Sequence, residues 1–196
     1  FWFTCWIRYV ISNSNIINLI SKIHEYKGEQ PYLLKTQKDT LESLTDIAKI
    51  ESTSSSNKIE GIYTTDKRIN EIVIKNLEPK NRNEEEIAGY RDVLTLIHEN
   101  YKYIDINQNT ILQLHRDLYK YTGYSYGGKF KNSQNYIEET NVKGEKKICF
   151  TPLNAVEPPI AVTELCQNYN AIVNDESCDL LILISIFILD FVSIHP

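Results

Sequence analysis

The sequence lacks methionine altogether, including at its first position, so we expect that a natural start is missing, through a fragment, a processing event or a misplaced reading frame. Cysteine is scarce as well, and no two of the four cysteines have the CxxC spacing of a zinc site. We therefore expect no metal site in this chain. Isolated thiols are typical of a reducing compartment, so we predict a cytoplasmic protein with buried, inert cysteines. These are Cys5, Cys149, Cys166 and Cys178.

Long apolar runs and an excess of positive charge are also missing. The apolar stretches at residues 1–11 and 180–189 are too short to cross a bilayer, and the first lacks the basic start of a signal peptide. We therefore expect no membrane partner. The formal net charge is -5, which excludes an overall field that would gather nucleic acid.

Several chemical signatures are absent. There is no GxGxxG or GxxxxGK[ST] segment, which argues against a Rossmann nucleotide site and a P-loop. There is also no GxSxG or HExxH segment, so neither an α/β-hydrolase nor a zinc protease is indicated.

The apolar residues that are present recur mostly with the period of an α-helix. The first helix is predicted to begin after Ser14 as its N-cap and to end before Pro31. The second is predicted from Leu41 to Ile50. It should end at residues 52–57, whose short polar side chains compete for backbone hydrogen bonds. Further helices are expected over residues 69–74, capped by Thr65, and over 83–101, 109–121, 160–172 and 177–189.

A cluster of glycines at Gly123, Gly127 and Gly128 interrupts this helical pattern. After it, residues 135–137 and 148–150 indicate two short strands around a turn. The predicted fold is therefore an all-α domain with one β-hairpin inserted before its last two helices. The final helix is apolar nearly all round and should be central. We divide the chain into an N-terminal helical extension, residues 1–35, and a core domain, residues 36–196.

His195 is the one histidine whose position suits catalysis. It directly follows the most apolar helix, so a rigid core would present it as a general base. His24, His98 and His115 fall within amphipathic helices and are interpreted as packing or surface residues.

Four segments resemble the Fic family, whose catalytic unit is also called the Fido domain. Ile194-His195-Pro196 is similar to the start of its active-site motif, which continues with Phe, any residue, an acidic residue, Gly-Asn, a small residue or Lys, and Arg. Residues 56–61 match its inhibitory pattern of Ser or Thr, three residues, Glu, then Gly or Asn. Residues 114–118 and 128–131 are similar to the helix that leads into the family's flap, with Lys131 where Arg is more frequent. Phe150-Thr151-Pro152 resembles the end of the flap, with Pro158-Pro159 a little later.

The resemblance covers roughly Tyr32 to Pro196 and implies a Fic-type helical core with the hairpin as its flap. It implies a protein adenylyltransferase that moves AMP from ATP to a Ser, Thr or Tyr hydroxyl of a target protein. His195 would be the catalytic base, and His195 and Glu60 would contact the nucleotide. The flap residues that would align the target are Ile137, Ile148, Phe150 and Thr151. ATP would act with Mg²⁺, whose acidic ligand is expected beyond Pro196.

The resemblance also implies autoinhibition by Ser56, Glu60 and Gly61. In the family this glutamate pairs with the second arginine of the active-site motif, which withdraws a cation from the γ-phosphate. The low helix propensity of residues 52–56 supports the hypothesis that this helix is marginally stable and releases Glu60 when needed.

Two other readings remain open. Related enzymes transfer UMP, phosphate or phosphocholine instead of AMP, and nothing in the sequence selects the donor. The chain is alternatively a truncated, non-catalytic helical module that binds or regulates another protein. Pairing with a second copy is left open, and nucleic acid would be a partner only if a winged-helix domain followed.

The 196-residue chain is expected to transfer no nucleotide, because most of the family's phosphate-binding loop would lie beyond Pro196. The measurement is incubation with labelled ATP. Label on the chain or on a partner that disappears with His195→Ala would contradict this expectation.

Overall fold

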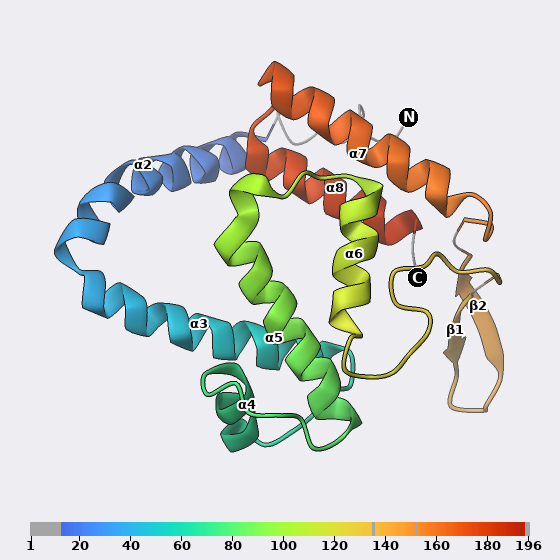
Figure 1. Ribbon diagram of the computed structural model, residues 1–196. Coiled ribbons are helices and arrows are strands. Elements are labelled where there is room, and N and C mark those ends of the chain that lie inside the picture. Colours follow the sequence, from blue (N-terminus) through green and yellow to red (C-terminus); the bar gives the residue numbers. More distant parts are fainter. Residues whose placement is uncertain (1–12, 135, 152, 195–196) are drawn as a thin grey trace. The chain divides into compact units, whose positions relative to one another are not determined.

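The computed structural model describes residues 13–134, 136–151 and 153–194 (Figure 1). Its elements are α2 (Ser14–Thr36), α3 (Lys38–Ile59), α4 (Asp66–Val73), α5 (Arg82–Asn100), the 3₁₀ turn η1 (Tyr101–Tyr103), α6 (Gln108–Leu118), β1 (Ile137–Thr140), β2 (Lys146–Phe150), α7 (Pro158–Asp175) and α8 (Leu180–Ile194). The two strands pair antiparallel as one hairpin before the last two helices. The predicted all-α architecture with an inserted hairpin is therefore confirmed.

The described residues separate into two compact units. Residues 27–105 and 109–129 form one, which we call the helical unit. The other comprises the described residues of 1–26, 106–108 and 130–196, and we call it the hairpin unit. Each is described by itself.

Two expectations about α2 were wrong. Its cap is Asn13, whose Oδ1 accepts hydrogen bonds from the N–H groups of Asn15 and Ile16, while Ser14 is already helical. The helix also does not break at Pro31 but continues to Thr36. Proline removes one backbone donor, and the following turn re-forms the ladder, as the bond from Gln37 N to Leu33 O shows.

The core of the helical unit lies between α4 and α5, which pack against each other and against α3 (Figure 1). Ile72, Ile87 and Ala88 are completely buried there. Partly buried Ile50, Ile62 and Tyr121 pack against this cluster. The remaining members of the cluster are Ile69 and Val73.

Helices α5 and α6 meet at Gly89. A Cβ added at this glycine would lie 1.9 Å from the carbonyl oxygen of Leu118, so no larger residue fits without moving α6. The glycine thus fixes how closely the two helices approach each other.

A buried ion pair joins α4 to the start of α5. The Arg68 guanidinium donates from Nε to Glu84 Oε1 at 3.0 Å and from Nη2 to Oε2 at 2.7 Å. Lys80 N–H donates to the same carboxylate at 2.9 Å. These bonds outweigh the cost of burial and lower the pKa of Glu84 to about 2. Glu84 therefore holds two helices together, in addition to lying in the first turn of α5.

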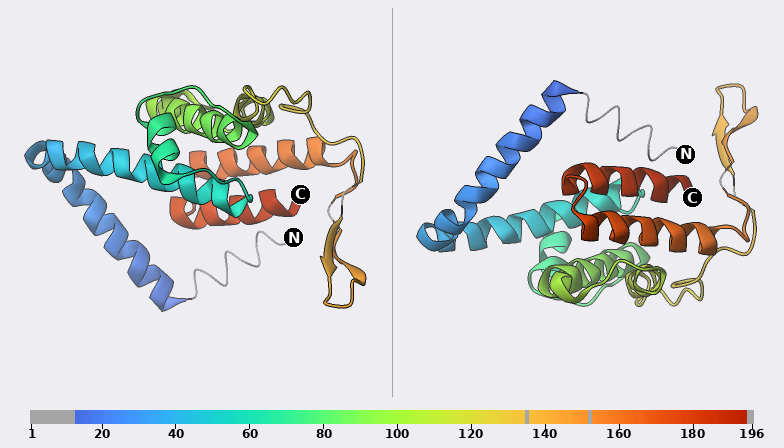
Figure 2. Two further views of the ribbon diagram at one scale, coloured as in Figure 1. Left: turned by 90° about the horizontal axis from the view of Figure 1, so that it is seen from below. Right: turned by 90° about the horizontal axis from the view of Figure 1, so that it is seen from above.

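In the hairpin unit, α7 and α8 lie side by side in both views of Figure 2. Tyr169 on α7 meets Phe187 on α8 edge to face, with ring centroids 5.1 Å apart. The expectation that α8 is central is not confirmed, because Ile188 and Val192 are each 55% exposed. Only one face of α8 is buried, through Leu183, Ile186 and Ile194.

The cysteines were predicted to be buried and inert. Cys166 is buried on α7, and burial raises the pKa of its thiol. Cys178 is half-buried, also with a raised pKa from burial. Cys149 contradicts the prediction, because it lies exposed on the hairpin, whose strands bury none of their residues. Cys5 lies outside the described residues.

Replacing Glu84 by glutamine should lower the free energy of unfolding at pH 7 by about 2 kcal/mol, because the partly buried Arg68 guanidinium loses its two-point carboxylate partner and keeps only Glu71 as an ionic partner. The pKa of Glu84 is about 2 in the folded state against an ordinary 4.5. The stabilisation is therefore complete above pH 4.5 and is lost as the pH falls from 4.5 through 2. Denaturant titrations between pH 7 and pH 2 measure it.

The matched control is Glu99→Gln, which alters an exposed carboxylate on the same helix. It should change stability by less than about 0.5 kcal/mol at any pH. Equal acid sensitivity of Glu84→Gln and the parent would contradict the role of Glu84.

Candidate functional site

The C-terminal half of α3 is held on α5 by hydroxyl groups. Ser52 and Ser56 lie one helical turn apart, and both reach the phenol of Tyr90 on α5. The distances to Tyr90 Oη are 3.3 Å from Ser52 Oγ and 2.9 Å from Ser56 Oγ. A phenol can donate one hydrogen bond while accepting another, so one hydroxyl serves both serines.

These contacts explain why α3 continues through residues 52–57, where the sequence had predicted its end. Thr53 is completely buried and Asn57 is 5% exposed. Asn57 Nδ2 donates to the carbonyl oxygen of Thr53 at 2.8 Å, inside its own helix. Packing and these bonds override the low helix propensity of the polar run. The Thr53 hydroxyl has no hydrogen-bond partner among the described residues.

The predicted inhibitory glutamate lies at the end of this helix. Glu60 is exposed at the C-cap, and its N–H donates to Asn57 O at 3.1 Å. Gly61 follows with φ of 76°, a left-handed conformation that favours glycine and turns the chain away from the helix. Ile62 N then donates to Asn57 O at 2.9 Å, and the Ile62 side chain packs against the core.

A tyrosine cluster at the end of α6 lies within the electrostatic reach of Glu60. Burial raises the pKa of Tyr119, and the negative charges of Glu86 and Glu60 raise it further. The ring of Tyr119 meets those of Tyr124 and Tyr126 edge to face, with centroids 6.0 Å and 5.2 Å apart.

The segment that was predicted to lead into the flap is fixed to α6. Gly128 N–H donates to His115 Nδ1 at 3.1 Å. Gly128 has φ of 74°, and a Cβ there would lie 2.8 Å from Arg116 Cβ. His115 thus accepts a hydrogen bond from the backbone of the segment that follows α6. This agrees with its interpretation as a packing or surface residue.

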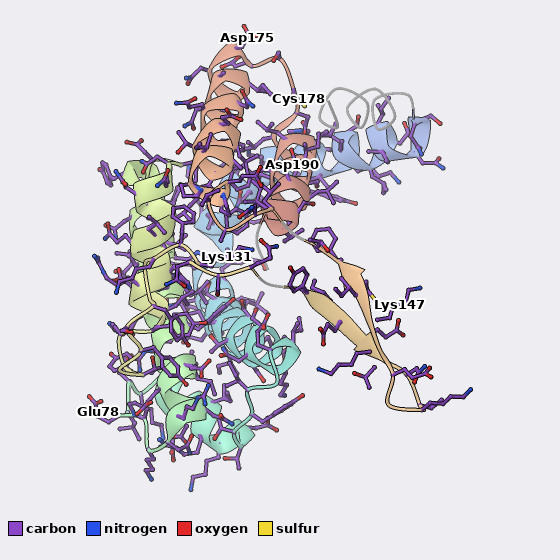
Figure 3. The ribbon with its side chains drawn as sticks, turned by 90° about the vertical axis from the view of Figure 1, so that its right-hand side faces the viewer. Glu78, Lys131, Lys147, Asp175, Cys178 and Asp190 are labelled. Atoms are coloured by element: carbon purple, nitrogen blue, oxygen red, sulfur yellow. The ribbon has the colours of Figure 1, made fainter. Side chains whose placement is uncertain are left out.

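Lys131, at the position where the resembling family more often has Arg, is labelled in Figure 3. Its ammonium nitrogen is buried and has no hydrogen-bond partner among the residues that the structure describes. Enclosing an ammonium group without a counter-charge is costly.

The two strands of the hairpin extend further toward the turn than predicted, and their register separates the candidate flap residues. Ile137 pairs with Phe150, but the next residue, Glu138, pairs with Ile148, so β2 contains one extra residue there. Neighbouring residues of β1 point to opposite faces. Ile148 and Phe150 therefore lie on opposite faces of the hairpin. Both are exposed, as are Ile137 and Thr151.

His195, Pro196, Asn135 and Pro152 lie outside the described residues. The described part of α8 ends at Ile194, which is 9% exposed. On the same helix, partial burial raises the pKa of Asp190, a residue that sequence reasoning left without a role (Figure 3).

Tyr90 was also missed. No role was assigned to it from the sequence, although its half-buried ring ends in a hydroxyl that bonds both serines. Ser52 and Ser56 are four residues apart and so lie on the same face of a helix. This spacing was the signal in the sequence that one partner could bond both hydroxyls.

No group of three or more His, Cys, Asp and Glu side chains within residues 13–194, where described, could hold a metal ion. In the same part of the chain, no helix has the length and apolar character needed to cross a membrane.

Comparison with known proteins identifies the fold. No family model and no curated protein matches the sequence. The structure is similar to a crystal structure of a Fic domain containing signaling protein from Bacteroides thetaiotaomicron VPI-5482, with a TM-score of 0.73 and 20% sequence identity. The match covers 89% of this chain and 65% of that one. The chain therefore has a Fic-type fold and spans about two thirds of that protein's length.

Replacing Thr53 by valine should raise the free energy of unfolding by about 1 kcal/mol, because valine has the same shape and removes a buried hydroxyl that has no partner. Thr45→Val on the same helix is the control. Its hydroxyl is exposed and bonds Leu41 O, so its removal should be nearly neutral. Destabilisation by Thr53→Val in denaturant titrations would show that the hydroxyl does have a partner.

Proposed function

We propose that this chain is part of a protein adenylyltransferase that transfers AMP from ATP to a Ser, Thr or Tyr hydroxyl of a target protein. The observation that carries the proposal is the Fic-type fold in combination with the matching segment at residues 56–61. That segment lies at the end of a helix that packs on the core of the same unit.

In this proposal Glu60 restrains the reaction. Its carboxylate would pair with an arginine of the active-site motif and so compete with the γ-phosphate of ATP for that cation. The exposure of Glu60 at a helix end suits this role, because its side chain is not engaged in the core. Ser56 and Gly61 would fix its position, one through Tyr90 and the other by turning the chain.

His195 would take the proton from the target hydroxyl, since an imidazole has a pKa near neutrality. The hairpin would hold an extended target segment by adding it as a further strand. Because Ile148 and Phe150 lie on opposite faces, only one of them can contact side chains on a given face of that segment. Bound Mg²⁺ would supply charge neutralisation of the phosphates, with its ligands outside the described residues.

The test uses a protein that continues past Pro196 through the whole active-site motif. Replacing Glu60 by glycine should raise modification of itself or a partner at least tenfold, because the competing carboxylate is removed. The mass added to the modified protein identifies the donor. An AMP adduct supports the proposal, and addition of UMP, phosphate or phosphocholine would replace it with a related transferase.

The control is Glu78→Gly, which alters an exposed glutamate in the loop between α4 and α5 (Figure 3). It should leave the rate unchanged. Equal rates for Glu60→Gly and the parent would reject the inhibitory role. No modification by either protein, with any donor, would favour the non-catalytic module.

A further inference from the structure

The last turns of α3 contact the rest of the helical unit through polar side chains, whereas the residues on either side of these turns make apolar contacts. Ile50 and Ile62 both pack against the core cluster. Between them, the hydroxyls of Ser52 and Ser56 meet Tyr90 on α5, and the two buried side chains of the same segment, Thr53 and Asn57, are polar as well. The two isoleucines fix the two ends of the segment, and the hydroxyl contacts hold its middle.

A contact between hydroxyl groups contributes less to the free energy of unfolding than an apolar contact of the same size. Water can replace hydrogen bonds between hydroxyl groups, so each contributes little net stability, whereas exposing an apolar side chain has no such compensation. Among the described residues, the hydroxyl of Thr53 has no partner and the amide nitrogen of Asn57 donates within its own helix, so neither is seen to add a polar bond across the interface. Opening of residues 52–61 is therefore inexpensive while the core stays intact.

We infer that Tyr90 is a positioning residue for the inhibitory segment: its hydroxyl holds Ser52 and Ser56, and thereby keeps Glu60 at the helix end from which it restrains the enzyme. This inference rests on the proposed inhibitory role of Glu60. Loss of the phenol hydroxyl frees the last two turns of α3 without disturbing α4 or α5. Tyr90 touches no reacting group and acts only through the position of Glu60.

The test begins with hydrogen–deuterium exchange on the 196-residue chain. Tyr90→Phe keeps the ring, leaves the intrinsic helix propensity of α3 unchanged, and should make amides within residues 53–61 exchange about tenfold faster. Amides of α4 and α5 should exchange as in the parent. Tyr121→Phe is the matched control, because it also removes a phenol that donates a hydrogen bond, to Asp92 Oδ2 at 2.8 Å, but one that does not touch α3.

A second variant approaches the contact from the other helix. Ser52→Ala combined with Ser56→Ala raises the helix propensity of α3 and removes both partners of Tyr90. Faster exchange in this variant would occur despite the higher propensity and supports the inference. Ser55→Ala, at an exposed position of the same run, should not accelerate exchange.

The second arm measures transfer in the protein with the complete active-site motif. Tyr90→Phe should raise the rate toward that of Glu60→Gly and add nothing when Glu60 is already glycine. Unchanged exchange overturns the inference. Faster exchange with an unchanged rate also overturns it, provided that Glu60→Gly is activating. If Glu60→Gly itself has no effect on the rate, the proposed inhibitory role of Glu60 has failed, and the inference about Tyr90 fails with it. This result differs from the two above, in which Glu60→Gly is activating but Tyr90→Phe is not, or in which exchange does not change.

Discussion

The hydrogen bonds from Ser52 and Ser56 to Tyr90, together with the burial of Thr53 and Asn57, hold the end of α3 in a helix, and the position of Glu60 depends on that end. The polar run by itself favours turns and caps, so without these contacts we expect the helix to end earlier. Here the local preference of the sequence and its tertiary contacts favour different structures. Such conflicts are typical of functional sites. The segment is ordered by a partner rather than by its own sequence.

Stronger interactions surround this weak one. The completely buried Ile72 and Ile87 join α4 to α5, and the Arg68–Glu84 pair joins the same two helices at their edge. Gly89 sets the approach of α6 through its contact distance to Leu118. Because α4, α5 and α6 are held this firmly, the end of α3 can open alone, and a local event does not become unfolding of the whole unit.

Much of the fold could be predicted from the sequence because most helices follow a regular apolar period and the hairpin follows a cluster of glycines. Thr65 caps α4 as predicted, since its Oγ1 accepts a hydrogen bond from Arg68 N. The errors fall where non-local partners decide. The length of α3 depends on its contact with Tyr90. The link that Glu84 makes between α4 and α5 depends on its bond with Arg68. The bulge at Cys149 depends on how the two strands pair. Pro31 shows a different error. Proline usually ends a helix, so the first helix was predicted to end before Pro31, but α2 continues through it.

The central claim is that Glu60 is held at the end of α3 in order to restrain a Fic-type active site. An experimental structure that includes the loop following Pro196 tests it most directly. The account predicts that the Glu60 carboxylate forms an ion pair with the second arginine of the completed motif. A carboxylate that faces solvent, with that arginine bound elsewhere in the absence of nucleotide, would contradict it.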